Sequence, residues 1–271
     1  MSVKRNVMLI ATLMSSVSCQ PKQHLSSMTE TKSLIVLDSF QHPYTFKDRE
    51  AGEKDLESLA KTASKEDEWF YVEDRHTKEG VWFDVGYQQT ATSTETDVQY
   101  LENLLNTVFA TSTIAKHQIE VTEYHIHPYR SLMEQILRSR KPTAYRRNDG
   151  TTTYGISPHD QEDASVPSSA DILAHATIKN AIKEETRLKG FFLLPAVVVT
   201  PWGKFVYDVS QDFAKRYEAE GAKFIKIAYE EAHQESESCK SMDCTLAIFG
   251  KHGMIIEYER RESPKVILMD R

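Results

Sequence analysis

QIEVTEYHIHP, residues 118–128, alternates apolar and polar side chains and then ends at a proline. This alternation predicts a β-strand over 118–127. His125 and His127 close the strand, and because side chains two residues apart lie on one face of a strand, both imidazoles point to the same side. Neutral imidazole is a common zinc ligand. The stretch therefore predicts two metal ligands at the edge of a sheet, with a packed or surface-exposed histidine pair as the alternative.

The segments on either side of this strand predict the rest of the sheet and the helices that cover it. Residues 68–73 and 80–87 are rich in aromatic and β-branched side chains, which is typical of a β-hairpin. A helix is expected over 169–188. Further strands are expected at 191–199, 204–209, 223–229, 245–250, 254–259 and 265–269. This order favours an α/β or α+β fold, with a mixed β-sheet flanked by helices in three layers.

A second motif lies at the head of the expected helix. PSSADI, residues 167–172, places Ser168 just before the helix and Asp171 at its third position. A serine followed three residues later by an acid is an ordinary capping box, in which both side chains bond backbone N–H groups of the helix start. If this helix start faces the end of the histidine strand, Asp171 becomes a third, anionic metal ligand. Three protein ligands with one open position are typical of catalytic zinc sites.

The two motifs together resemble the JAMM metalloproteases, and most of all the RadC branch of that superfamily, whose pattern is H-N-H-P followed by P-S-x-x-D-I. The resemblance covers about residues 65–210 and implies a zinc ion held by the two histidines and the aspartate. It also implies amide hydrolysis by a metal-activated water, with Glu68 as the general base and Glu73 as the second choice for that role. Ser168 is the implied oxyanion donor.

In one respect the chain departs from the family pattern. His127 and Asp171 are 44 positions apart, a much longer interval than in that family. An insertion at about 129–166 must therefore be looped out between the two ligands. Loop closure becomes only slowly less favourable with length, by about 0.6 kcal/mol per doubling, so such an insertion is thermodynamically permitted. Its stretch from 144 to 167 is polar and is expected to be one long loop.

Other side chains near these motifs offer alternative ligands. Glu123 shares the strand face of the two histidines and could replace Asp171, and His175 stands one turn after Asp171 on the expected helix. For Glu123 the alternative is packing or a bond to a ligand histidine, and for His175 the alternative is a residue that simply lines one face of the helix. His159, Asp160 and Asp163 are expected to belong to a solvated acidic loop rather than to a cation site.

The N-terminus has the pattern of an export signal. Lys4 and Arg5 precede the apolar run 7–14, and small residues then lead to Cys19. The run is too short to span a bilayer as a mature helix. Cys19 after a small residue resembles the lipobox of bacterial lipoproteins, although Ser16 stands where that pattern usually has leucine. A plain cleaved signal or an uncleaved apolar tail is the alternative.

These features predict the organisation of the whole chain. We expect a lipoprotein signal peptide over 1–19, a polar tether over 20–32 and a single α/β domain over 33–271. Cys239 and Cys244 remain once the lipidated cysteine is set aside. In an oxidising compartment these two cysteines are expected to form a disulfide, and a zinc-binding cysteine pair is the alternative.

Composition restricts the class of partner. The 271 residues carry a net charge of −7, and no long basic run is interleaved with aromatic residues, so nothing favours binding to nucleic acid. The expected protein is a lipid-anchored, cell-envelope zinc peptidase or isopeptidase acting on a peptide or protein substrate. The alternatives are a non-catalytic surface lipoprotein, serving binding or assembly, and a metal-binding but inactive scaffold.

Overall fold

The computed structural model describes residues 44–46, 48–87, 95–96, 103–105, 118–139, 142–184 and 190–269. All of these residues belong to one compact unit, Leu34–Arg271. The expected signal peptide, the tether and Cys19 lie outside the described residues. Among the helices that the structure describes, none combines the length and the apolar character needed to cross a bilayer.

The described residues form short strands and helices in mixed order. The strands are β1 (Tyr44–Phe46), β2 (Asp67–Asp74), β3 (Gly80–Asp84), β4 (Gly86–Tyr87), β5 (Glu95–Thr96), β6 (Ile119–Ile126), β7 (Thr143–Arg146), β8 (Thr152–Ile156), β9 (Phe192–Leu193), β10 (Ala196–Thr200), β11 (Gly203–Val209), β12 (Met254–Arg260) and β13 (Ile267–Met269). The helices are α1 (Arg49–Thr62), α3 (Tyr129–Ser139), α4 (Pro158–Asp163), α5 (Ser169–Glu184), α6 (Gln211–Glu220), α7 (Ala222–Ser236) and α8 (Met242–Lys251).

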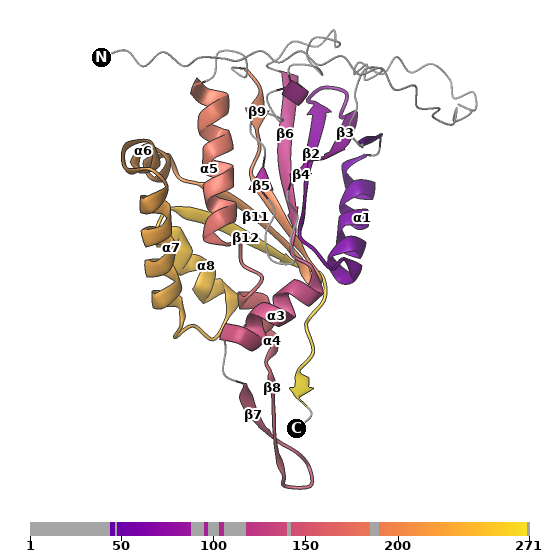
Figure 1. Ribbon diagram of the computed structural model, residues 1–271, viewed down its shortest axis with the longest axis vertical. Coiled ribbons are helices and arrows are strands. Elements are labelled where there is room, and N and C mark those ends of the chain that lie inside the picture. The colour runs from indigo at the N-terminus through magenta and orange to yellow at the C-terminus, as the bar shows by residue number, and fades with distance from the viewer. Residues whose placement is uncertain are drawn as a thin grey trace, which may run out of the picture. The chain divides into compact units, whose positions relative to one another are not determined.

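A mixed sheet forms the centre of the unit (Figure 1). Its strand order is β1-β3-β2-β6-β10-β11-β12, with β9 paired to β6. The histidine strand β6 runs parallel to β10 and β9 and antiparallel to β2. The expected hairpin is present as β2 and β3, which pair in antiparallel register. The predicted α/β fold, a mixed sheet flanked by helices, is confirmed.

Successive side chains of a strand point to opposite faces of the sheet. Helices cover both faces here because the strands carry apolar side chains on both. On one face, α1 packs Leu56 and Ala60 against Trp82 and its aromatic neighbours. The opposite face carries α5, α6, α7 and α8, which lie together on one side of the sheet in Figure 1. Buried side chains there include Phe205 of β11 and Phe249 of α8.

The insertion between β6 and α5 is folded, which corrects the expected long loop over 144–167. It contains α3, the antiparallel β7–β8 hairpin and α4, and β13 from the C-terminus pairs with β8. Most of the side chains of β7 are exposed. Without a buried face, a short strand shows no alternation of apolar and polar residues, so the sequence pattern that predicts strands is missing.

Two of the expected C-terminal strands are helices. Residues 223–229 belong to α7 and residues 245–250 to α8, whereas 254–259 lies in β12 as expected. The side chains that α7 buries recur at helical spacing: Phe224, Ile225, Ala228, Ala232 and Ser236. The expected disulfide between Cys239 and Cys244 is present and links the segment after α7 to the first turn of α8.

Candidate metal centre

Strand β6 brings the two histidines to one buried place. His125 lies within β6 and His127 directly after it, where the His127 N–H donates to the Val199 carbonyl at 2.9 Å and so continues the pairing with β10. The imidazole rings lie 5.0 Å apart at an interplanar angle of 79°. His125 is 7% exposed and His127 is 6% exposed. The pair is therefore an interior feature and not a surface one.

The start of α5 supplies the third side chain. The Ser168 N–H donates to Asp171 Oδ2 at 2.6 Å, and the Asp171 N–H donates to Ser168 Oγ at 3.3 Å, which completes the expected capping box. The same carboxylate faces both histidines. Asp171 Oδ1 lies 2.8 Å from His125 Nδ1, and Asp171 Oδ2 lies 3.4 Å from His127 Nε2. Capping and contact with the histidines therefore occur together.

These three residues form a buried group that could hold a metal ion. One candidate ligand atom from each of them lies within 4.8 Å of the others. Within the described part of the chain, no other cluster of three or more histidine, cysteine or acidic side chains meets this distance. His127 Nδ1 is buried and has no hydrogen-bond partner among the described residues, whereas the buried His125 Nε2 lies 3.4 Å from Glu66 Oε2. A buried polar atom without a partner is unfavourable by about 1–3 kcal/mol. The donor set of two imidazoles and one carboxylate fits a divalent cation.

The charges of the group are strongly coupled. Burial alone would lower the pKa of His125, but the carboxylates of Asp171 and Glu66 raise it well above its ordinary value. Burial alone would raise the pKa of Asp171, but His125 and His127 lower it well below its ordinary value. Without a metal, the site therefore holds a proton on His125 beside an ionised Asp171, and a cation would take the place of that proton.

Two glutamates stand beside the histidines at the start of β2. Glu68 is paired with His125 in the strand register and is buried, which places its side chain next to the imidazole on the same face. Glu66 precedes it by two residues, and its Oε2 lies 3.4 Å from His125 Nε2. Ser131 Oγ donates to the other oxygen of Glu66 at 3.4 Å. Sequence reasoning missed Glu66, which lies just before β2 and two residues before Glu68.

A cavity of about 1390 Å³ adjoins the metal group. His127, Glu66, Ser168 and Asp171 line it, and so do side chains of α3 and α4 in the insertion. The end of α7 and Cys239 complete the wall. The insertion therefore forms part of the space through which a molecule would approach the metal group.

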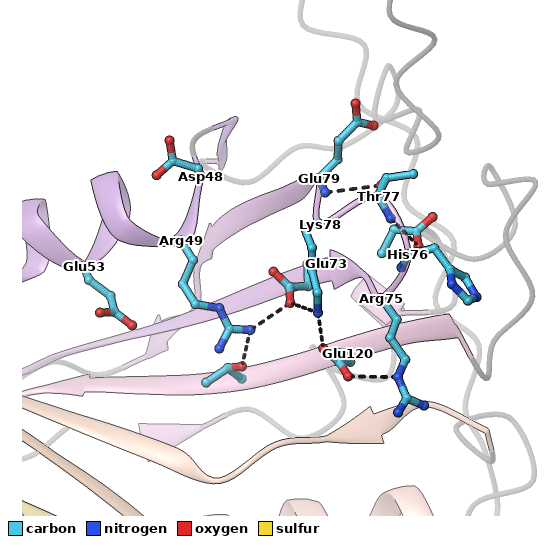
Figure 2. Close-up of polar contacts among 12 residues, drawn as sticks. Asp48, Arg49, Glu53, Glu73, Arg75, His76, Thr77, Lys78, Glu79 and Glu120 are labelled. Atoms are coloured by element: carbon cyan, nitrogen blue, oxygen red, sulfur yellow. Dashed lines mark hydrogen bonds and ion pairs between the residues drawn. The ribbon is translucent and has the colours of Figure 1, made fainter.

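The remaining residues singled out in the sequence are not members of the metal group. Glu73 is at the other end of β2, where its Oε1 lies 3.3 Å from Arg49 and 3.1 Å from Lys78 (Figure 2). Glu123 and His175 pair with each other, at 3.2 Å, and are not members of the metal group. His159, Asp160 and Asp163 lie in helix α4 rather than in the expected acidic loop, and all three line the cavity. Asp160 takes part in a capping box, and His159 Nε2 lies 3.1 Å from the Cys239 carbonyl oxygen.

Comparison of the chain with protein-family models, with curated protein sequences and with solved structures gives no match.

Proposed function

We propose that this protein is a zinc-dependent peptidase or isopeptidase of the JAMM-like type. The observation that carries the proposal is the buried His125, His127 and Asp171 group, in which one nitrogen of each imidazole faces the same carboxylate. Two imidazoles and one carboxylate, supplied by a strand end and a helix start, are a ligand set typical of catalytic zinc. The adjoining cavity of about 1390 Å³ leaves room for a substrate beside this group, and the resemblance of the two motifs to the JAMM pattern is what favours a peptide or protein.

The roles of the chain's own residues follow from where they lie. A bound zinc ion would supply activation of water and polarisation of the substrate carbonyl. A carboxylate of the Glu66 and Glu68 pair would accept the proton of the attacking water and deliver it to the leaving amine. The Ser168 hydroxyl, on the cavity wall, would donate to the developing oxyanion, an interaction worth about 3 kcal/mol in other enzymes.

The test of this proposal is hydrolysis of a proteome-derived peptide mixture by the purified protein, followed by mass spectrometry. We expect cleavage that a chelator abolishes and that added zinc restores. Glu66→Gln and Glu68→Gln are made separately, because replacement of the base removes cleavage while zinc stays bound. We expect the larger loss for Glu66→Gln, since Glu66 lines the cavity. Cleavage that persists in both variants, or that the chelator does not affect, contradicts the proposal.

We also propose that the chain is exported and held at the cell envelope by a lipid on Cys19. The N-terminal sequence pattern supports this assignment. The Cys239–Cys244 disulfide supports export as well, because disulfides persist mainly in oxidising compartments. A non-catalytic lipoprotein is the competing function, and it predicts neither bound zinc nor hydrolysis.

A further inference from the structure

Strand β6 and helix α5 carry a second buried pair directly beside the metal ligands. Glu123 lies two residues before His125 on the same face of β6, and His175 lies one turn after Asp171 on α5. The two elements are thus joined at two successive levels. His125 Nδ1 lies 2.8 Å from Asp171 Oδ1 at the first level, and His175 Nδ1 lies 3.2 Å from Glu123 Oε2 at the second.

The second pair is anchored on both sides of the imidazole. Glu123 is 2% exposed and His175 is 1% exposed. His175 Nε2 lies 3.1 Å from Asp208 Oδ1 of β11, and Lys179 Nζ donates to the same oxygen at 2.5 Å. His175 therefore connects α5 to β6 through one ring nitrogen and to β11 through the other.

This anchoring restricts how Asp171 can move. An α-helix is a stiff rod that rises about 1.5 Å per residue, so four residues separate the two levels by about 6 Å. Any rotation or sliding of α5 on the sheet that carries Asp171 away from His125 must also separate His175 from Glu123. A buried glutamate without its partner is strongly unfavourable, which opposes that movement.

We propose that Glu123 and His175 are a positioning pair that holds Asp171 within coordination reach of the two histidines, and so sets the metal affinity of the site. Neither residue is a metal ligand in this proposal. It rests on the proposed metal site and adds the reason why the start of α5 stays aligned with the end of β6.

The test is zinc affinity, measured by competition with a chromophoric chelator, together with the visible spectrum of the cobalt-substituted protein. Glu123→Ala should weaken zinc binding by roughly 10- to 100-fold, as loss of outer contacts does in other zinc sites, and should change the cobalt spectrum. Glu123→Gln keeps an acceptor for His175 and should retain affinity close to that of the wild type. If Glu123→Ala does not fold, the double variant Glu123→Leu/His175→Leu is used instead, because it removes both members of the buried pair. Its zinc affinity and cobalt spectrum are compared with those of the wild type in the same way.

Glu73 provides the matched control. It is also a buried glutamate paired with cations, but it lies toward the other end of the same sheet, beside Arg49 and Lys78 (Figure 2). Glu73→Ala should lower stability and leave the zinc affinity and the cobalt spectrum unchanged.

The outcomes separate this inference from the proposed function. Wild-type affinity and spectrum in folded Glu123→Ala or in the double variant overturn the positioning role alone. The same role is overturned if Glu73→Ala weakens zinc binding by an equal factor, because the effect is then one of general stability. A wild-type chain that binds no zinc overturns both proposals.

Discussion

The carboxylate of Asp171 takes part in two sets of contacts at once, because it accepts a hydrogen bond from the Ser168 N–H while it faces two imidazoles. A capping box alone explains the first set. It does not explain why the helix start is buried against two imidazoles, with His125 Nδ1 and His127 Nε2 both turned toward the same carboxylate. A cation held by these three side chains would account for this convergence.

Asp208 gives a pH-dependent prediction at the scale of one residue. Burial alone would raise its pKa, but hydrogen bonds from His175 and Lys179 lower the pKa to about 2. A carboxylate whose pKa is lower in the folded than in the unfolded protein stabilises the fold at pH values above the unfolded-state pKa. This contribution is lost as the pH falls through the folded-state pKa. Asp208→Asn should therefore lower the free energy of unfolding by about 1–2 kcal/mol at pH 6, after allowance for partial exposure.

Chemical denaturation between pH 6 and pH 2 checks this expectation. The difference between wild type and Asp208→Asn should shrink from about pH 4 downward and fall to about a fifth of its pH 6 value near pH 2. Asp212→Asn, at an exposed aspartate, is the control and should show no comparable trend. A deficit of constant size across the whole range would show that the charge of Asp208 is not what stabilises the fold.

Single residues were predictable where a short motif carries them. H-x-H-P and P-S-x-x-D point to His125, His127 and Asp171, and the structure brings these three together. Glu66 has no such motif, because its place beside His125 depends on the pairing of β2 with β6, which are distant in the chain. Likewise, the capping motif could not reveal that Asp171 also faces the histidines.

At the scale of elements, the sequence pattern was informative where the element buries most of its side chains or one clear face. The β2–β3 hairpin and β6 are buried over most of their length, α5 buries one face, and all of them were predicted. In α7, two adjacent apolar residues and a further isoleucine at 227 imitate the pattern of a strand, yet Phe224, Ala228 and Ala232 form a helical stripe. The β7–β8 hairpin is stabilised by backbone pairing with few buried side chains, so no pattern predicted it.

The seating of α1 on the sheet gives a prediction at this scale. Gly52 lies against Trp82, and a Cβ atom at position 52 would be 2.1 Å from the indole ring, which is itself buried. Gly52→Ala should raise intrinsic helix propensity by about 1 kcal/mol. We nevertheless expect a net loss of about 1–3 kcal/mol, because the helix must move away from the indole.

Thermal and chemical denaturation of Gly52→Ala measure this balance. Ser58→Ala, on the exposed side of the same helix, is the control and should be neutral or slightly stabilising. A Gly52→Ala protein that is more stable than wild type would mean that α1 does not pack against Trp82 at this distance.

At the scale of the whole molecule, the insertion changes what the site can accept. The metal group is built from β6 and α5, and residues 129–166 between them contribute α3 and α4 to the wall of the adjoining cavity. The mixed sheet could be predicted from the order of elements along the chain. The cavity could not, because it depends on how the insertion and the end of α7 pack together.

The location of the molecule is predicted from its N-terminus. Cys19→Ala should move the protein from the membrane fraction to the soluble fraction and abolish labelling by radioactive palmitate in a bacterial host, since a thiol at that position is required for the lipid. The double variant Cys239→Ser/Cys244→Ser should remain labelled. Palmitate labelling that survives Cys19→Ala would contradict the lipoprotein assignment.

The central claim is that two imidazoles and one carboxylate from separate parts of the chain surround a single cation, and elemental analysis of the purified protein tests it most directly. We predict about one zinc per wild-type chain and close to none in folded His125→Ala. A wild-type chain that carries no zinc at neutral pH, or a His125→Ala chain that keeps its full zinc content, would contradict the claim.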